Sequence, residues 1–342
     1  MKKNLLFNSL FLILLGCKDE HSLINCKGIP NLNQAFSYMY FKTVNEGYLF
    51  GTYTEYEELS EKELEDPNNI PRATSEANIY KTTDGGKNWV KINSVANHSY
   101  FNMATQLNDE IYILQNDVSK DFKFSIAKFC MKNENIENFK NTKPISTIWS
   151  NYNKLYYTNN RGIYKLYTLD NEQNLDSLII ENYALSGLSL NDSLFSIFSN
   201  KETTYFGRIN EESKEIQLPI IPKSMTSQNG KTILIAGKSI TNEKDISLVS
   251  YDLRLNQPML VKKFKEYSIV ENLQSNDKVI IGYIGNIKGV FTEFDLLYSL
   301  DNGRTWQIKK LEEPNYVGPS SLIDNIVYIY SGGSRIQRIV LY

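Results

Sequence analysis

Polar turns and apolar runs alternate along this chain in a regular pattern. Each turn is built around Asn, Asp or Gly, and a short run of apolar or alternating residues typical of a β-strand follows at once. Asn-Asp and Asn-Gly tolerate the positive φ that a tight hairpin requires, so the pattern predicts a hairpin at each copy. Seven copies occur, at residues 44–50, 107–113, 151–157, 190–196, 228–234, 275–281 and 323–329.

The spacing of these copies predicts the fold. It is roughly 40 to 48 residues, the size of a four-stranded propeller blade. The first interval is longer by about 20 residues, which an acidic insertion at about 55–76 explains. The repeat therefore predicts an all-β fold, a single β-propeller of seven four-stranded blades over residues 35–342. A six-bladed ring with irregular ends is the competing architecture.

The last repeat is shorter than the others. Residues 316–342 supply only three strands, centred near Ser320, Tyr328 and Arg338. We expect the fourth strand to come from Ser22–Lys27, within an N-terminal segment at 17–34. Pairing the two ends of the chain would close the ring and remove an exposed sheet edge, which otherwise invites aggregation.

The first residues have the features of an export signal. Lys2 and Lys3 precede a short apolar stretch at 5–15, too short to span a bilayer as a helix. It ends in Leu14-Leu15-Gly16-Cys17, which resembles the bacterial lipobox. The resemblance implies that residues 1–16 are a signal peptide and that Cys17 becomes the lipid-carrying first residue. A plain secretory signal with a chance cysteine is the alternative.

The residues after Cys17 bear on localisation. Lys18-Asp19-Glu20 resembles the surface-export signal of Bacteroidetes-type lipoproteins. That resemblance implies lipid attachment to the outer membrane and exposure on the cell surface, whereas a solvated charged spacer is the alternative. Two other cysteines, Cys26 and Cys130, are expected on non-adjacent blades, beyond the separation that a disulfide allows. We therefore expect two free thiols.

Composition and charge exclude several functions. The chain has 37 basic and 39 acidic residues and no basic run, so nucleic acid is not an expected partner. Its 23 tyrosines and 16 phenylalanines favour strands. The two histidines, His21 and His98, form no zinc-binding spacing, and no Gly-rich phosphate loop occurs. We expect neither a metal nor a cofactor.

Two further turns share a more specific pattern, Ser/Thr-x-Asp-x-Gly-x-x-Trp. It is similar to the Asp box, or BNR repeat, of sialidases, sortilin-type domains and photosystem II assembly factors. Asp170 lies in a degenerate third copy, with Glu172 in the glycine position and Leu175 in the tryptophan position. The two complete copies consist of Thr82, Asp84, Gly86 and Trp89, and of Ser299, Asp301, Gly303 and Trp306.

The Asp-box pattern predicts a structural role. The carboxylate is suited to accept backbone N–H groups across the turn, glycine adopts a conformation that side chains resist, and tryptophan covers the hairpin. The resemblance implies that the box joins the outer two strands of a blade, away from the ligand face. We expect loss of Asp84 or Trp89 to reduce stability without changing ligand specificity.

The ligand is expected on the opposite face of the disc. Loops from second to third strands, and from one blade to the next, open there. They include the acidic insertion, the loop 285–290 and Gly332-Gly333-Ser334. The insertion is either functional or a solvated excursion with a helical turn over 59–64. Trp149 is either a ligand-face aromatic or a core residue.

These patterns favour a non-catalytic binding or assembly module for a protein, peptide or glycan. The alternative is an exo-sialidase or related glycoside hydrolase, whose substrate carboxylate would require clustered arginines. Arg72, Arg161 and Arg335 are the arginines expected to reach the ligand face, although Ile70-Pro71-Arg72 is not the Arg-Ile-Pro motif of sialidases. A purely structural component of a surface complex is a third hypothesis.

Overall fold

The computed structural model describes residues 21–342 apart from several short segments. The expected signal peptide at 1–16, Cys17, Arg72, Arg161 and Asp170 therefore lie outside the described residues. The excepted segments are 31–33, 61–62, 64, 66–68, 70–72, 96–98, 118–122, 143–144, 152–153, 160–164, 170–174, 181, 191–192, 200–202 and 210–213.

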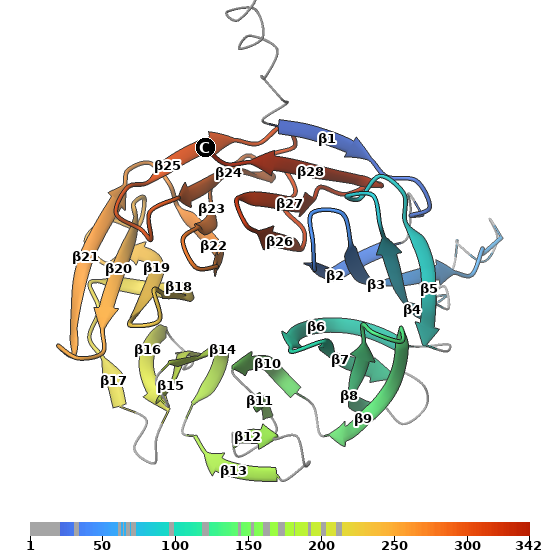
Figure 1. Cartoon of the computed structure of the whole chain (residues 1–342), viewed down its shortest axis with the longest axis horizontal. Helices are drawn as coiled ribbons and strands as arrows, with labels where there is room; N and C mark the ends of the chain where they lie inside the picture. The colour runs from blue at the N-terminus through green and yellow to red at the C-terminus, as the bar shows by residue number, and fades with distance from the viewer. Residues whose placement is uncertain are drawn as a thin grey trace, which may run out of the picture.

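Seven four-stranded antiparallel sheets are arranged as the blades of a closed ring (Figure 1). The chain is a seven-bladed β-propeller, as the spacing of the turns predicted, and the six-bladed alternative is wrong. In each of the first six blades the strands follow one another from the centre outward. Blade 1 comprises β2 (Gln34–Phe41), β3 (Gly47–Tyr56), β4 (Ala73–Thr82) and β5 (Val90–Val95); blade 2 comprises β6 (Ser99–Leu107), β7 (Glu110–Asp117), β8 (Lys123–Cys130) and β9 (Asn135–Thr142); blade 3 comprises β10 (Ile145–Asn151), β11 (Lys154–Asn159), β12 (Lys165–Leu169) and β13 (Leu175–Ile179).

The next three blades repeat this order, and the turns identified in the sequence join their strands. Blade 4 comprises β14 (Tyr183–Leu190), β15 (Ser193–Ser199), β16 (Thr204–Ile209) and β17 (Lys214–Ile216); blade 5 comprises β18 (Ile220–Gln228), β19 (Thr232–Ser239), β20 (Ile246–Asp252) and β21 (Gln257–Phe264); blade 6 comprises β22 (Ile269–Ser275), β23 (Ile280–Lys288), β24 (Phe291–Ser299) and β25 (Gln307–Lys310).

Blade 7 is built from both ends of the chain. Its three C-terminal strands are β26 (Ser320–Ile323), β27 (Ile326–Tyr330) and β28 (Arg335–Val340), and its edge strand is β1 (His21–Asn25). The antiparallel register runs from His21 opposite Ile339 to Asn25 opposite Arg335. The predicted closure by pairing of the terminal strands is confirmed.

Apolar side chains fill every interface between neighbouring blades. Seven clusters of buried residues occur, and each draws its members from two adjacent blades. Successive residues of a strand point to opposite faces of its sheet. In β3, Tyr48 and Phe50 therefore pack toward blade 2, whereas Leu49 packs toward blade 7. Burial of both faces explains the continuous apolar runs after the polar turns.

The interface between blades 7 and 1, here called the seam, combines aromatic and polar contacts. The rings of Phe41 and Tyr328 stack with centroids 3.8 Å apart. The Tyr328 hydroxyl donates to the carbonyl of Val44 at 2.7 Å, and the Phe41 N–H donates to the Ser321 hydroxyl at 2.9 Å. These contacts hold β26 and β27 of the last blade against the inner hairpin of the first.

The segment after β1 also contacts blade 1 through its backbone. The Lys27 N–H donates to the carbonyl of Lys87 at 2.9 Å, and the Trp89 N–H donates to the carbonyl of Lys27 at 2.8 Å. Gly28 follows with φ of +82°, and a Cβ placed there would lie 1.9 Å from the Trp89 carbonyl oxygen. Only glycine allows this close approach, so the N-terminal segment is clamped between β28 and the β4–β5 turn.

The two cysteines of the ring are free thiols, as expected from their separation. Cys26 is buried at the seam and Cys130 ends β8 in blade 2. Burial raises the pKa of the Cys26 thiol to about 12, so this group stays protonated and unreactive at neutral pH.

Replacing Gly28 with alanine should destabilise the ring by about 2–4 kcal/mol, because positive φ and a backbone clash both oppose the new methyl group. Chemical denaturation measures the loss. Gly230 provides the matched control, since its φ is +64° but nothing lies within 4 Å of an added Cβ. Gly230→Ala should cost only about 1 kcal/mol. Equal losses at the two positions would contradict a clamp at Gly28.

Candidate functional site

The disc has two unlike faces. The loop face carries the connections between second and third strands, such as β3–β4, β23–β24 and β27–β28, together with the links between blades. The turn face carries the inner hairpin turns, such as β2–β3, and the outer turns β4–β5 and β24–β25 beside them. Backbone bonds join these two kinds of turn, from Gly85 to Asn45 and from Asn302 to Lys278.

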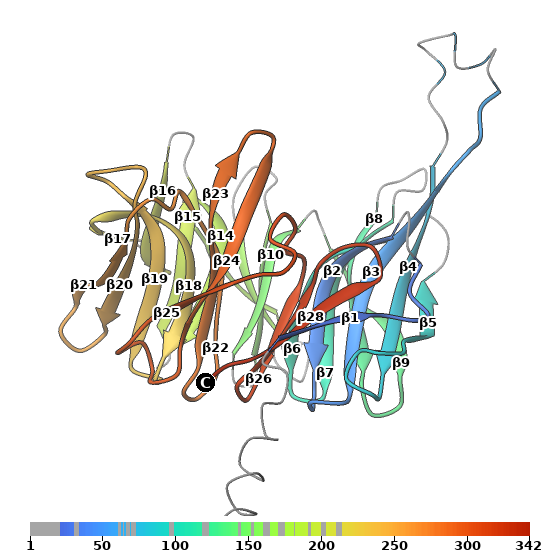
Figure 2. The same cartoon turned by 90° about the horizontal axis from the view of Figure 1, so that it is seen from above.

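The acidic insertion lengthens a hairpin on the loop face. Strands β3 and β4 stay paired as far as Tyr56 opposite Ala73, and Figure 2 shows them extending beyond the disc. Within the insertion, the Ser60 N–H and hydroxyl donate to the Glu63 carboxylate at 2.9 and 2.6 Å. The Glu63 N–H donates back to the Ser60 carbonyl, an arrangement typical of the start of a helical turn. These bonds lower the pKa of Glu63.

A second long hairpin rises on the same face in blade 6 (Figure 2). Its tip is apolar: Ile287, Val290 and Phe291 are 68%, 90% and 61% exposed. Lys288 lies beside them and pairs with Glu293 at 2.5 Å. Exposed apolar side chains gathered at the tip of a rigid hairpin are typical of a contact surface rather than of a fold requirement.

A cavity of about 470 Å³ lies next to this hairpin, between blades 5 and 6. Lys223 of β18 and Lys238 of β19 line one side, and Glu271 of β22 and Ile287 line the other. Charged and polar side chains that line this cavity therefore lie next to the apolar tip of the β23–β24 hairpin.

Only one of the three candidate arginines lies within the described residues. Arg335 begins β28 beside the loop Gly332-Gly333-Ser334, and its guanidinium pairs with Glu313 at 2.5 Å. Arg72 and Arg161 are outside the described residues. Among those described, the structure therefore does not gather the arginine cluster that a sialidase site would need.

Trp149 belongs to the core between blades 3 and 4. Its side chain is buried and stacks on Tyr156, with ring centroids 5.6 Å apart. A Cβ at Gly187 would lie 2.0 Å from the indole, so a glycine of blade 4 makes room for the ring. Of the two interpretations, the core role is the one observed.

The turn at Asp84 joins β4 to β5, the outer strands of blade 1. One carboxylate oxygen accepts the N–H groups of Lys87 and Asn88 at 3.1 and 2.9 Å and the Thr82 hydroxyl at 2.9 Å. The other oxygen accepts the Asn88 amide at 2.6 Å. Gly86 has φ of +91°, and its carbonyl accepts the Trp89 indole N–H at 2.9 Å.

The turn at Asp301 repeats this arrangement between β24 and β25 of blade 6. Its carboxylate accepts the backbone N–H of Thr305 at 2.8 Å, the Thr305 hydroxyl at 2.7 Å and the Ser299 hydroxyl at 2.8 Å. The bonds from Thr305 come first among the groups that lower the pKa of Asp301 to about 2. At Asp84, partial burial opposes ionisation, but bonds from Asn88 and Thr82 outweigh it and lower the pKa.

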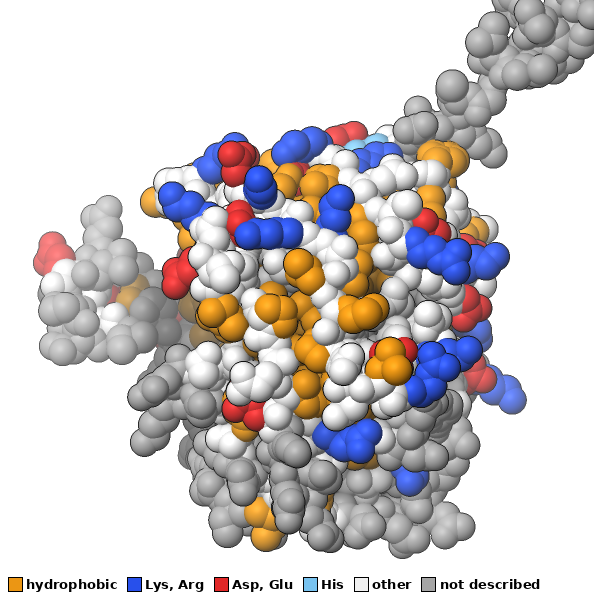
Figure 3. Space-filling model, turned by 90° about the vertical axis from the view of Figure 1, so that its left-hand side faces the viewer, with side chains coloured by type: hydrophobic (Ala, Val, Ile, Leu, Met, Phe, Trp, Pro, Cys, Tyr) orange, Lys and Arg blue, Asp and Glu red, His pale blue; other side chains and the backbone are white. Residues whose placement is uncertain are grey.

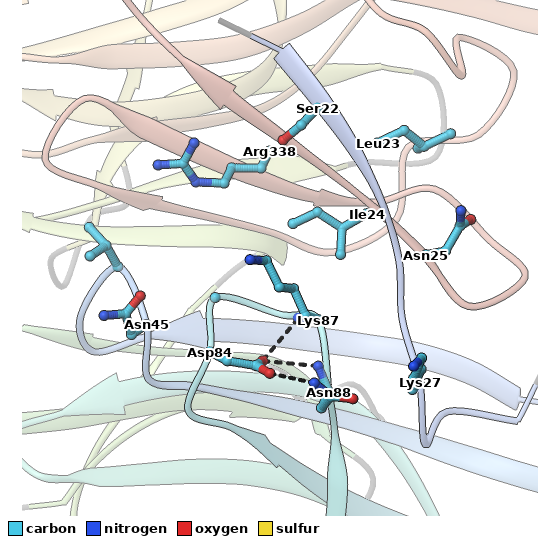
Figure 4. Close-up of a pocket in the computed structure, with 12 residues that line it drawn as sticks. Ser22, Leu23, Ile24, Asn25, Lys27, Asn45, Asp84, Lys87, Asn88 and Arg338 are labelled. Carbon is cyan, nitrogen blue, oxygen red and sulfur yellow. Dashed lines mark hydrogen bonds between the residues drawn. The ribbon is translucent and has the colours of Figure 1, made fainter. Parts of the chain in front are cut away.

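A cavity of about 810 Å³, here called the seam pocket, opens between β1 and the Asp84 turn. Figure 4 shows Arg338 and Lys87 extending into the space between β28 and that turn. The pocket is lined by Ser22, Leu23, Ile24, Asn25, Lys27, Val44, Asn45, Asp84, Gly85, Lys87, Asn88 and Arg338.

The sequence did not indicate the seam pocket. Arg338 was placed only as the centre of a strand, and Lys87 only as a variable position of the Asp box. Because β1 and β28 are separated by about the whole chain, no local motif joins these residues. Arg338 and Lys87 are brought together by the register of Ser22 opposite Arg338 and by the backbone bond from Lys27 to Lys87.

Apolar and charged side chains are intermixed on the outer rim. Figure 3 views the disc from the left-hand side of Figure 1, where β21 forms the edge of blade 5. Met259 and Leu260 of this strand are 58% and 60% exposed. Lys262 and Lys263 follow in the same strand, and such charges discourage edge-to-edge pairing.

The described residues contain no group of three His, Cys, Asp or Glu side chains placed to hold a metal ion. Within the same part of the chain, no helix is long and apolar enough to cross a membrane.

No family model and no curated protein matches the sequence. Solved structures share its fold at low identity. The β-propeller domain of the Trilobed protease from Pyrococcus furiosus, which has an open velcro topology, aligns with a TM-score of 0.60 and 11% identity over 90% of this chain and 92% of that one. Virginiamycin B lyase from Staphylococcus aureus aligns with a TM-score of 0.57 and 11% identity, over 94% and 99% of the two chains.

An acylaminoacyl peptidase from Pyrococcus horikoshii is also similar, with a TM-score of 0.58 and 10% identity over 87% of this chain. Here the alignment covers 49% of the peptidase, so this chain corresponds to about half of that protein. At such identities these likenesses show the fold, and proteins with this fold carry out different activities.

Replacing Asp84 with alanine should reduce the free energy of unfolding by about 1–2 kcal/mol, because two backbone N–H groups lose their acceptor. Denaturant titration measures the change. Thr83→Ala is the matched control in the same turn, since the Thr83 side chain is exposed. Binding at the loop face should be unchanged in both variants. A folded Asp84→Ala chain that had lost loop-face binding would contradict the structural role.

The Asp301 turn should make stability depend on acid pH. Its folded-state pKa of about 2 lies below the usual value of 3.8, so the ionised carboxylate stabilises the fold above that value. This contribution is lost as pH falls from about 4 to about 2. In thermal melts across this window, Asp301→Asn should show a shallower fall in Tm than the unchanged chain. Parallel falls would contradict the assignment.

Proposed function

We propose that this chain is an exported, lipid-anchored β-propeller that binds a protein, peptide or glycan on its loop face without catalysing a reaction. The observation that carries the proposal is the tip of the β23–β24 hairpin, where Val290 is 90% exposed and Ile287 and Phe291 are mostly exposed. Apolar side chains gathered in solvent contribute no burial free energy to the fold, whereas covering them with a partner would stabilise a complex.

The rest of the loop face supports binding rather than chemistry. The acidic β3–β4 hairpin and the apolar β23–β24 hairpin stand on the same side of a rigid disc (Figure 2). A partner seated on this face would meet carboxylates on one side and apolar groups with lysines on the other. In the part of the chain that the structure describes, Arg335 is committed to Glu313 and no arginine cluster forms.

The sequence supports the anchor and the family. The lipobox ending in Cys17 favours lipid attachment, and Lys18-Asp19-Glu20 favours the outer membrane with the disc exposed on the cell surface. Several acyl chains give lasting attachment where one gives only marginal binding. The shared hydrogen bonding of the Asp84 and Asp301 turns supports membership of the Asp-box group, with its sortilin-like and photosystem II assembly-factor-like members.

Loop-face binding can be tested by photo-crosslinking in intact cells. A photoreactive amino acid at position 290 should give a specific adduct, because this position would be covered by the partner. The same residue at position 255 is the control, since Leu255 is 61% exposed but belongs to the β20–β21 turn on the turn face. Equal adducts at both positions, or none at 290, would contradict the proposal.

A glycan array and a panel of fluorogenic glycosides distinguish binding from catalysis. We expect no turnover by the chain that begins at Lys18. Hydrolysis of a sialoside that is abolished by Arg335→Ala would instead establish the sialidase alternative.

The anchor has a separate test. Cys17→Ala should move the protein from the membrane fraction to the soluble exported fraction, because the lipid acceptor is lost. Fractionation followed by immunoblotting measures the shift, with Cys26→Ala as the control for loss of a thiol. Full membrane retention of Cys17→Ala would overturn lipid anchoring and would leave the loop-face prediction intact.

A further inference from the structure

The seam pocket concentrates positive charge. Three of its lining residues, Lys27, Lys87 and Arg338, are cationic, and Asp84 is the only carboxylate among them. Both Asp84 oxygens already accept hydrogen bonds from the turn. Among the described residues, no carboxylate lies within ion-pairing distance of Arg338 or Lys87. The pocket therefore has an excess of positive charge that its own groups do not neutralise.

Phosphate suits this arrangement. A guanidinium presents paired donors to a phosphate group, and an ammonium adds a second charge. Figure 4 places Arg338 and Lys87 on opposite sides of the opening, with the Asn45 amide nearby and the Ile24 side chain between them. A volume of about 810 Å³ is in the range of small-molecule sites. A phosphate with an uncharged or hydroxylated substituent fits both the charge and the size.

The position of the pocket in the disc indicates which source of phosphate it would meet. Ser22 lines the pocket, and His21 lies opposite Ile339, close to the turn face. Leu341, two residues further, donates its N–H to the Asn325 carbonyl in the turn between β26 and β27. Cys17 precedes His21 by four residues, which span at most about 14 Å. A lipid on Cys17 would thus hold the seam pocket close to the headgroups of the membrane.

We propose that the seam pocket binds the phosphate of anionic lipid headgroups, an inference that rests on the lipid anchor proposed above. Arg338 and Lys87 hold the phosphate, and Asn45 contributes an amide at the same opening. The anchor and the pocket together fix the disc at two points, with the turn face toward the bilayer. The loop face, with its two long hairpins, then points away from the membrane toward its partner.

Vesicle binding tests the pocket without the anchor. The chain beginning at Lys18 retains all the described strands of the ring and carries no lipid. We expect it to bind vesicles of phosphatidylglycerol and phosphatidylcholine in preference to vesicles of phosphatidylcholine alone. The double variant Arg338→Gln/Lys87→Gln should bind the anionic vesicles at least about 10-fold more weakly, since each basic residue near a charged surface contributes measurably.

Arg304→Gln is the matched control. Arg304 occupies the same place in the Asp301 turn as Lys87 in the Asp84 turn, but it does not line the seam pocket. This variant should bind like the unchanged chain. If Arg304→Gln weakened binding to anionic vesicles as much as the double variant, the effect would be one of overall charge, and the proposal of a phosphate site in the seam pocket would be overturned. Thermal melts establish that all the variants are folded.

Inorganic phosphate distinguishes a headgroup from a free ligand. If the pocket binds headgroup phosphate, millimolar phosphate should reduce vesicle binding of the unchanged chain more than an equal ionic strength of chloride. Binding of inorganic phosphate by the unchanged chain but not the double variant, without any preference for anionic vesicles, would overturn the membrane source. If the unchanged chain bound neither anionic vesicles nor inorganic phosphate, the proposed phosphate site would be overturned. Failure of the lipid anchor would appear separately, as membrane retention of Cys17→Ala.

Discussion

Each blade of this disc carries apolar side chains on both of its faces, so no blade can be left without a neighbour on either side. The ring must therefore close, and the chain closes it with β1, which adds the fourth strand to blade 7. The buried Gln337 side chain secures that pairing by bonding to Ser331 and to the N–H of Glu312, with His21 at 3.0 Å. Closure also fixes where the N-terminus leaves the disc, which decides how an anchored disc would face a membrane.

The same closure creates an asymmetry among otherwise similar blades. The turns at Asp84 and Asp301 have similar hydrogen bonds, but only the Asp84 turn lies beside β1. There the backbone of Lys27 pairs with Lys87 and Trp89, and the side chains of Lys87 and Asn88 line a pocket. The turn that stabilises blade 6 thus has a counterpart in blade 1 that also lines the proposed phosphate site, because β1 lies next to it.

Local pattern was sufficient to predict the architecture. The Asn- and Gly-containing turns predicted the number of blades, because each turn is a local feature of the sequence. The short final repeat predicted that a strand from the N-terminus completes blade 7, because three strands leave the last blade one short. The functional surfaces depend on more distant relations. The loop 285–290 was identified, but the exposure of Ile287 and Val290 follows from how far β23 and β24 extend together. Arg338 and Lys87 meet only through ring closure, and the spacing of the repeats predicted that the terminal strands pair but not the register that sets Ser22 opposite Arg338.

The loop face and the seam pocket make different demands on the fold. The hairpin at Val290 projects from the disc and contributes little to burial, so its side chains can change without loss of the core. The seam pocket is formed by β1, β28 and the Asp84 turn, which also hold the ring closed. Its cationic side chains extend away from those backbone contacts, which are made by Lys27, Lys87 and Trp89 main-chain atoms. The charge of the pocket can therefore be altered by side-chain substitution while the backbone clamp is retained. Phosphate recognition and ring closure thus depend on different atoms, although both involve the same residues.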